Sequence, residues 1–223
     1  MSYLNKIKSK LEGGESDKTS DFQFKVTIIG DMGVGKTSIM SRYVTNDFSP
    51  IHRATIGVEF KLKRLIIDDT IVSLKLWDTC GEEKYNSITR QYYKNANGVL
   101  IVFDLTNPKS IEKLNQWLAN VKDENDENIV VFLVGNKSDA KNKILQLSEE
   151  GRKFAESNSI PYSEVSAKTG SGITGLFDSI ARKMVEVGKK LIGQNANNGK
   201  QKNLLIQHEK SYVKKEKDNK KCC

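Results

Sequence analysis

The chain has 223 residues, of which 37% are hydrophobic, and it carries a formal net charge of +8. This length suits one α/β domain with tails and allows a sizeable buried core. No apolar run reaches the roughly 18 residues needed to span a bilayer, and the N-terminus lacks the apolar segment of a signal peptide. Three cysteines, two of them the last two residues, cannot build a disulfide framework or a four-ligand zinc site. We therefore expect a cytoplasmic protein.

The positive charge is concentrated at the end of the chain. Residues 188–223 contain ten lysines and three acidic residues, which accounts for seven of the eight net charges. A nucleic-acid-binding protein usually carries its cations on a folded face with interleaved aromatic residues, whereas this tail has Tyr212 alone. The pattern argues against nucleic acid and favours a membrane surface, or solubility alone, as the reason for the charge.

Predicted elements begin after a polar N-terminal extension, residues 1–21, which lacks a periodic apolar face. Residues 24–29 alternate in polarity and are rich in β-branched side chains, so they predict a strand. A glycine-rich loop follows, and residues 38–44 continue with the spacing of a helix. Residues 58–67 and 71–77 predict two strands of a hairpin, joined by a short turn that begins with two aspartates.

The second half of the chain alternates between strand-like and helix-like segments. Short apolar runs at residues 98–104 and 129–135 are typical of strands buried on both faces of a sheet. Residues 110–121, 148–157 and 174–187 have helical periodicity. The apolar stripes of the first and last helices are Ile111, Leu114, Trp117, Leu118 and Val121, and Leu176, Phe177, Ile180 and Met184. This alternation predicts a mostly parallel sheet with helices on both faces, with a ligand at the carboxyl ends of the strands.

The most informative motif is the G-x-x-x-x-G-K-[ST] pattern of residues 30–37, which is typical of phosphate-binding loops in P-loop nucleotidases. Glycines let the backbone curl around an anion with its N–H groups inward. Lys36 supplies a positive charge for the β- and γ-phosphates, and the hydroxyl of Thr37 suits Mg²⁺. The loop precedes a helix N-terminus, whose dipole favours phosphate. For this loop by itself, a tight glycine turn without a ligand is the alternative.

Three further motifs follow in the order that a guanine-nucleotide site requires. Asp78 ends a strand and suits Mg²⁺ coordination through water, and Gly81 lets a backbone N–H approach the γ-phosphate. Residues 136–139 (Asn-Lys-Ser-Asp) end in a carboxylate that can accept hydrogen bonds from both N1–H and the exocyclic amine of guanine, a donor pair that adenine lacks. Residues 166–168 then close the base pocket. Each motif alone could be an ordinary turn, but the ordered set favours a guanine nucleotide.

With these motifs the chain resembles a Ras-superfamily small GTPase, and specifically a Rab, over residues 22–187 and at its C-terminus. The segments that carry the resemblance are 56–60 (Ile-Gly-Val-Glu-Phe), 84–89 (Lys-Tyr-Asn-Ser-Ile-Thr), 92–96 (Tyr-Tyr-Lys-Asn-Ala), 101–106 (Ile-Val-Phe-Asp-Leu-Thr) and the final Cys222 and Cys223. The resemblance implies the small-GTPase form of the P-loop NTPase fold, an α/β domain over residues 22–187 whose mostly parallel six-stranded sheet has helices on both faces.

The resemblance also implies roles for individual residues at the nucleotide site. Thr37 and Thr55 would coordinate Mg²⁺ directly, and Asp78 would act through water. Phe48 falls where the family packs an aromatic ring against the base. The residues expected to bind GTP or GDP are Gly30, Gly33, Val34, Gly35, Lys36, Thr37, Ser38, Phe48, Thr55, Gly81, Asn136, Lys137, Asp139, Ser166, Ala167 and Lys168.

By the same resemblance, Phe60, Trp77 and Tyr92 form an aromatic trio presented to effectors, although aromatic residues near a sheet can equally pack as core. The γ-phosphate and Mg²⁺ would order residues 48–60 and 80–95, and hydrolysis would release both segments. Expected partners are effector proteins, an exchange factor, a GTPase-activating protein, a GDP-dissociation inhibitor and a prenylation escort.

Two positions depart from the family pattern. Rabs usually have Ala-Gly-Gln-Glu after the Asp-Thr pair, whereas residues 80–83 are Cys-Gly-Glu-Glu, so Glu82 replaces the glutamine that orients water. A carboxylate cannot donate as an amide does, and it adds negative charge beside an anionic γ-phosphate. We therefore expect slow intrinsic hydrolysis, unless Glu82 points away and an activating protein supplies the missing groups. Met32 stands where a small residue is common. The expected catalytic residues are Glu82, Lys36, Thr55 and Gly81.

The last residues, Lys220-Lys221-Cys222-Cys223, do not form a C-a-a-X signal. Paired terminal cysteines resemble the Rab signal for double geranylgeranylation, and two lipid chains hold a membrane stably where one does so marginally. Neighbouring lysines favour an anionic leaflet. Residues 188–223 would then be a flexible basic tail that leads to the cytosolic face of an intracellular membrane. A solvated tail with incidental cysteines is the alternative.

The sequence thus predicts a Rab-like GTPase that binds and hydrolyses GTP and acts as a membrane-anchored switch in vesicle-mediated transport. A hydrolysis-impaired module that stays bound to GTP is the second hypothesis, which Glu82 and Met32 favour. An ATP-using P-loop kinase or ATPase is the third, and Asp139 argues against it.

Overall fold

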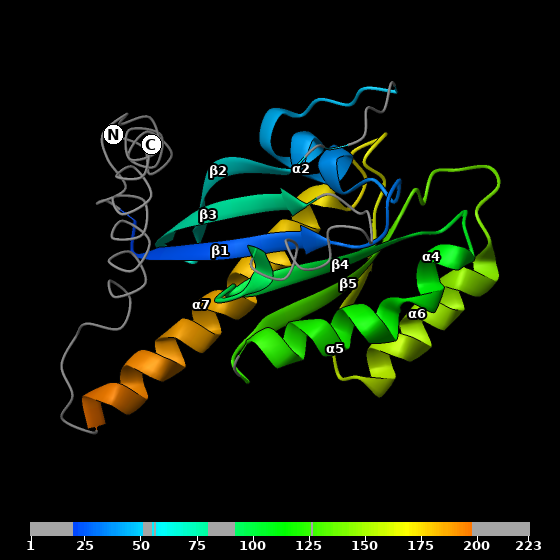
Figure 1. The fold of residues 1–223 in the computed structure, drawn as a ribbon. Coiled ribbons are helices and arrows are strands. Elements are labelled where there is room, and N and C mark those ends of the chain that lie inside the picture. Colours follow the sequence, from blue (N-terminus) through cyan, green and yellow to red (C-terminus); the bar gives the residue numbers. More distant parts are fainter. Residues whose placement is uncertain (1–19, 51–54, 56, 80–91, 126, 198–223) are drawn as a thin grey trace, which may run out of the picture. The chain divides into compact units, whose positions relative to one another are not determined.

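A computed structural model of the chain describes residues 20–50, 55, 57–79, 92–125 and 127–197. Within these residues the strands form one six-stranded sheet in the order β2-β3-β1-β4-β5-β6 (Figure 1). The strands are β1 (Phe22–Ile29), β2 (Val58–Ile67), β3 (Thr70–Thr79), β4 (Gly98–Asp104), β5 (Val130–Asn136) and β6 (Tyr162–Glu164). β2 and β3 are antiparallel, and the other neighbouring pairs are parallel. The predicted fold class is therefore confirmed.

The hairpin of β2 and β3 turns where the two aspartates predicted it. Asp68 and Asp69 adopt left-handed backbone conformations, with φ of 46° and 65°, which aspartate tolerates better than most residues. The Asp68 carboxylate also pairs with the guanidinium of Arg182. Both partners are exposed, so this ion pair contributes little to stability.

The helices are α2 (Lys36–Thr45), α4 (Lys109–Glu112), α5 (Leu114–Glu124), α6 (Leu145–Ser157) and α7 (Ile173–Asn197). One face of the sheet packs against α5 and α6 in a buried cluster that includes Ile101, Phe103, Leu118 and Leu147. On the other face, the space above Gly98 of β4 is filled by the side chains of α7, because an added Cβ would lie 2.8 Å from Met184 Sδ. Helices therefore cover both faces, as predicted (Figure 1).

Two helix predictions need correction. The helix expected over residues 110–121 is divided at Lys113, where α4 ends and α5 begins. The buried Ser110 side chain holds the first turn to the end of β4, since its hydroxyl accepts the N–H of Asp104 at 2.9 Å and donates to Asn107 O at 2.7 Å. The predicted stripe is otherwise right, because Leu114, Trp117, Leu118 and Val121 are buried.

The last helix is longer than its apolar pattern indicated. It runs to Asn197 rather than to residue 187. Lysine, leucine and glutamine in this stretch are good helix formers, so the helix continues although its apolar face has ended. The described part of the chain divides into two units, and the boundary between them, after residue 184, falls within α7.

Candidate nucleotide-binding site

The phosphate loop, residues 30–37, connects the end of β1 to the start of α2, at the carboxyl edge of the sheet. Gly30, Gly33 and Gly35 have φ of 138°, 79° and 96°, in the region that favours glycine. At Gly35 an added Cβ would lie 2.3 Å from Asn136 Nδ2. The loop thus needs glycine both for its backbone conformation and for its close approach to β5.

Gly30→Ala is expected to destabilise the fold severely. An added Cβ would lie 2.2 Å from the carbonyl oxygen of Val102, a backbone atom of the central strand β4 that cannot move aside, and φ is 138°. We expect a loss of about 3 kcal/mol or more in the free energy of unfolding, measured by denaturant titration. Gly175→Ala is the control, because this position in α7 has open space, and alanine should stabilise the helix by up to about 1 kcal/mol. Equal effects at the two glycines would contradict the steric argument.

Lys36 is almost fully buried against the phosphate loop, with 6% of its surface exposed. Its Nζ donates hydrogen bonds to the carbonyl oxygens of Gly30 at 2.8 Å and Asp31 at 2.9 Å. The loop therefore curls around the ammonium group and leaves a fixed positive charge at its centre. Met32, by contrast, is 62% exposed on the same loop.

Thr37, Thr55 and Asp78 bring their side-chain oxygens together beside the phosphate loop. The Thr37 hydroxyl donates to Asp78 Oδ2 at 2.5 Å and lies 2.8 Å from the Thr55 hydroxyl oxygen. Asp78 is fully buried, and burial raises the pKa of its carboxyl group to about 6, although the Thr37 hydrogen bond and the Lys36 charge act in the opposite direction. Thr37 comes from α2, Thr55 from the segment before β2, and Asp78 from β3.

The chemistry of this oxygen cluster fits Mg²⁺. Asp78 Oδ1 is buried without a hydrogen-bond partner among the described residues. A divalent cation would satisfy that oxygen and offset the cost of burying the charge, and Mg²⁺ prefers carboxylate, hydroxyl and water oxygens. Within the described part of the chain, no group of three or more histidine, cysteine or acidic residues offers another metal site.

Asn136, at the end of β5, joins three of the predicted motifs. Its side chain is buried, its Nδ2 donates to the carbonyl oxygen of Val34 in the phosphate loop at 2.8 Å, and its Oδ1 accepts the N–H of Ala167 at 3.2 Å. Asp139 Oδ1 in turn accepts a hydrogen bond from the Ser166 hydroxyl at 2.5 Å. The structure therefore places residues 136–139 and the base loop, which we define as residues 166–170, in direct contact.

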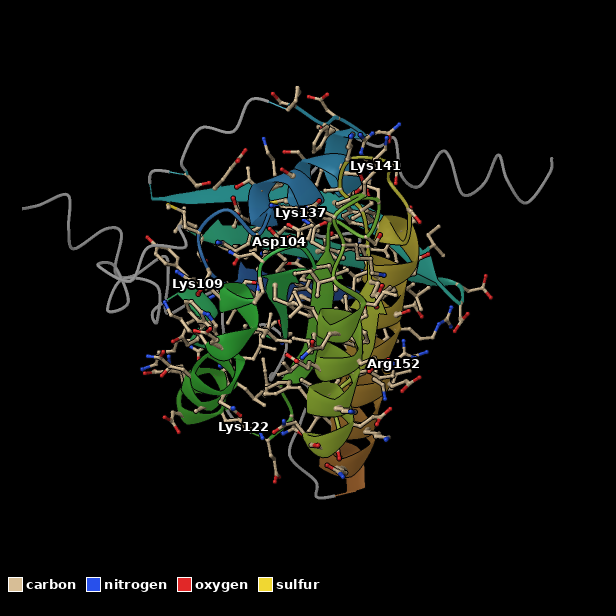
Figure 2. The ribbon with its side chains drawn as sticks, turned by 90° about the vertical axis from the view of Figure 1, so that its right-hand side faces the viewer. Asp104, Lys109, Lys122, Lys137, Lys141 and Arg152 are labelled. Carbon is tan, nitrogen blue, oxygen red and sulfur yellow. The ribbon has the colours of Figure 1, made fainter. Side chains whose placement is uncertain are left out.

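Asp104 is a neighbour of this site that the sequence did not single out. Lys137 has a left-handed backbone conformation, with φ of 67°, and its Nζ lies 2.6 Å from Asp104 Oδ2 (Figure 2). The other carboxylate oxygen of Asp104 accepts the N–H and the hydroxyl of Thr106. Strand register could have pointed to Asp104, because Asp104 and Asn136 end paired strands at the same edge of the sheet.

The remaining residues expected to bind the nucleotide are placed less directly. Lys168 is exposed in the base loop, and Ser38 is half-buried in the first turn of α2. Phe48 is half-buried beyond the end of α2, and its N–H donates to the Asp47 carboxylate at 2.8 Å.

The aromatic trio predicted for effectors is contiguous, with Phe60 on β2, Trp77 on β3 and Tyr92 in the segment before β4. Ring centroids of Phe60 and Trp77 are 5.1 Å apart, and those of Trp77 and Tyr92 are 6.0 Å apart. Phe60 is 46% exposed, so it is not ordinary core. Lys25 Nζ lies 5.7 Å from the Trp77 ring and donates to Lys94 O, and burial lowers the pKa of Lys25 to about 8. The sequence did not point to Lys25.

Several expectations lie outside the described residues. They concern Gly81 and Glu82, the terminal Cys222 and Cys223, and most of the N-terminal extension. Their roles stay predictions. Among the described residues, no helix combines the length and apolar composition needed to cross a bilayer.

The fold and the phosphate loop together define a P-loop nucleotide-binding protein of the α/β class. Residues 25–186 match the Ras family. The chain is 38% identical to the Ras-related protein RIC2 of Oryza sativa over 208 residues, covering 91% of this chain and 96% of that protein. It is 38% identical to Rab11E of Lotus japonicus, covering 81% and 83%, and 41% identical to RABA1i of Arabidopsis thaliana, covering 76% and 78%. The chain therefore belongs to the Ras family, as a Rab-type small GTPase.

Family membership establishes the general activity. Ras-family GTPases bind guanine nucleotides and Mg²⁺, and Rab-type members act in vesicle-mediated transport with regulators and effectors. The recognition from sequence motifs is thereby confirmed.

Proposed function

We propose that this chain binds GTP and GDP at the site built by the phosphate loop, the Thr37–Thr55–Asp78 oxygen cluster and the base loop, and that it hydrolyses GTP slowly. The observation that carries the proposal is the oxygen cluster, in which a buried carboxylate with an unpartnered oxygen lies beside two hydroxyl groups next to the phosphate loop. Such a cluster is costly to bury unless a cation completes it.

Each part of the site has its own task in this proposal. Backbone N–H groups of the loop and the Lys36 ammonium hold the phosphates at the start of α2, where the helix dipole adds to the attraction. Thr37 and Thr55 would hold Mg²⁺ directly and Asp78 would hold it through water, and the bound ion would neutralise charge on the phosphates. Asp139 accepts two hydrogen bonds from guanine.

The switch follows from the position of Thr55. This residue comes from the segment before β2 and contacts Thr37, so a γ-phosphate bound together with Mg²⁺ would anchor that segment through Thr55. Loss of that anchor would release the segment, and partners would distinguish the two states at the neighbouring trio of Phe60, Trp77 and Tyr92. Effectors, an exchange factor and a GTPase-activating protein are the partners this cycle needs.

Glu82→Gln tests the proposed slow hydrolysis. The nucleotide that copurifies with the full-length protein is released by denaturation and identified by chromatography. If Glu82 impairs the orientation of water, the wild type should retain a substantial fraction of GTP, and the variant should shift the content toward GDP with a single-turnover rate at least about tenfold higher. Glu83→Gln is the matched control and should leave the rate unchanged.

The outcomes separate the hypotheses. Copurified GDP in the wild type, with no gain from Glu82→Gln, would contradict the proposed role of Glu82 and leave the cycling switch in place. GTP in both proteins would favour the alternative of a GTP-bound recruitment module, which the relationship to Rabs does not favour. Adenine nucleotide would contradict the role given to Asp139.

We further propose that residues 22–187 act as the GTPase domain and that residues 188–223 serve as a basic tether. Geranylgeranyl groups on Cys222 and Cys223, with neighbouring lysines, would anchor the protein reversibly to the cytosolic face of an intracellular membrane. A prenylation escort and a GDP-dissociation inhibitor would handle the lipidated form in the cytoplasm. Mass spectrometry of the C-terminal peptide from the native host tests this anchor.

A further inference from the structure

Arg42 of α2 contacts both segments that flank the expected base site, although no sequence motif marked it. Its Nε donates to the carbonyl oxygen of Ala167 at 2.9 Å, and its Nη2 donates to that of Lys168 at 2.8 Å. Its Nη1 donates to the carbonyl oxygen of Asn46 at 2.8 Å and to the side-chain oxygen of Asn46 at 3.2 Å. One guanidinium group therefore connects the base loop to Asn46, the residue that caps the C-terminus of α2.

At the helix end, the connection is reciprocal. The N–H of Asn46 donates to the carbonyl oxygen of Arg42 at 3.1 Å, and Asn46 has a left-handed backbone conformation, with φ of 55°. The two residues thus form a closed hydrogen-bonded turn. The chain then continues through Asp47 to Phe48, so the turn sets the direction in which that segment leaves the helix.

At the base loop, the arginine fixes the orientation of two peptide groups. In a planar trans peptide the C=O and N–H groups point in opposite directions. Holding the Ala167 carbonyl on the α2 side therefore turns the N–H of Lys168 to the opposite side. The N–H of Ala167 is already bonded to Asn136, and that of Thr169 to the Ser166 hydroxyl, so the loop is held from both sides.

The loop geometry accommodates the arginine stem. Gly170 has a φ of 86°, and a Cβ added there would lie 3.6 Å from Arg42 Cδ. The stem therefore runs alongside the loop, and the guanidinium reaches its acceptors without leaving the surface of α2. Lysine could not reproduce this arrangement, because its single ammonium group cannot span three carbonyl groups as a planar fork does.

We propose that Arg42 is a positioning residue that couples the segment leading to Phe48 with the base loop, so that the two open together and nucleotide release is slow. This inference rests on the proposed guanine-nucleotide binding. One planar guanidinium holds both segments, so loosening either segment lets the group reorient and weakens its hydrogen bonds to the other. The arginine thus makes release a concerted event at the base end of the site.

The test is the dissociation rate of fluorescently labelled mant-GDP from the full-length protein. Arg42→Gln should accelerate release at least about tenfold, because it removes charge-assisted hydrogen bonds on both sides of the base, and Arg42→Lys should give a smaller increase. The same ratio should remain after Mg²⁺ is chelated, since Arg42 acts away from the oxygen cluster. Arg182→Gln, which breaks the exposed pair with Asp68, should change the rate less than twofold.

Amide hydrogen exchange distinguishes coupling of the two segments from a general loss of stability. In Arg42→Gln, residues 46–48 and 166–170 should lose protection together, while β4 and β5 keep theirs. An unchanged release rate, or loss of protection in one segment alone, would overturn the inference. If Arg42→Gln folds poorly, the lysine variant decides. If the wild type fails to bind mant-GDP, the proposed function is wrong. Hydrogen exchange then still tests whether Arg42 couples the two segments.

Discussion

Asp139→Asn is expected to lower the affinity for GDP and GTP by at least about a hundredfold. The carboxylate would accept hydrogen bonds from N1–H and from the exocyclic amine of guanine, and each such charge-assisted bond is worth about 1.5–3 kcal/mol. The NH₂ group of asparagine would face one of the two N–H donors of guanine. One hydrogen bond is therefore lost, and two donors are left facing each other. Competition against labelled GDP measures the change.

The same variant should gain relative affinity for xanthine nucleotides. Xanthine carries a carbonyl oxygen where guanine has the exocyclic amine, which matches an amide that both accepts and donates. The Ser166 hydroxyl can still donate to the amide oxygen, so the contact with the base loop survives the substitution. Asp123→Asn, on the exposed surface of α5, is the control and should bind GDP as the wild type does. A GDP affinity within a few-fold of wild type in Asp139→Asn would rule out the role of Asp139.

Asp78→Asn is expected to have opposite effects on stability and on metal binding. With EDTA at pH 7, the variant should unfold at higher denaturant concentration than the wild type, by about 1–2 kcal/mol, because it removes a fully buried charge. An amide oxygen can still accept the Thr37 hydroxyl. With Mg²⁺ and nucleotide present, the order should reverse, since the wild type alone can hold the cation with a carboxylate.

The pH dependence of the metal-free wild type follows from the same burial. The pKa of Asp78 is raised from 3.8 to about 6, so the folded protein binds the proton more tightly than the unfolded chain does. Stability from this group is therefore present below pH 4 and is lost as the pH rises to about 6, by roughly 1.4 kcal/mol per pKa unit. Asp78→Asn should lack this loss. Equal pH profiles in EDTA would contradict the argument.

The sequence predicted those parts of the fold whose signal is local. Residues 58–67 and 98–104 were bounded correctly, because strand alternation and continuous apolar runs are properties of neighbouring residues. The break at Lys113 was missed, because it depends on the Ser110 side chain reaching back to Asp104. β6 was not singled out, since three half-buried residues carry too short a pattern.

Residue types at fixed spacing were enough to predict the phosphate loop, the order of the nucleotide motifs and the Rab-type family. The contacts between these motifs could be seen in the folded chain alone: Asn136 joins the phosphate loop to the base loop, Asp104 pairs with Lys137, and Arg42 contacts both sides of the base site. Most of these contacts end on backbone carbonyl or N–H groups. Almost every residue carries such groups, so no sequence pattern marks which of them a side chain will reach.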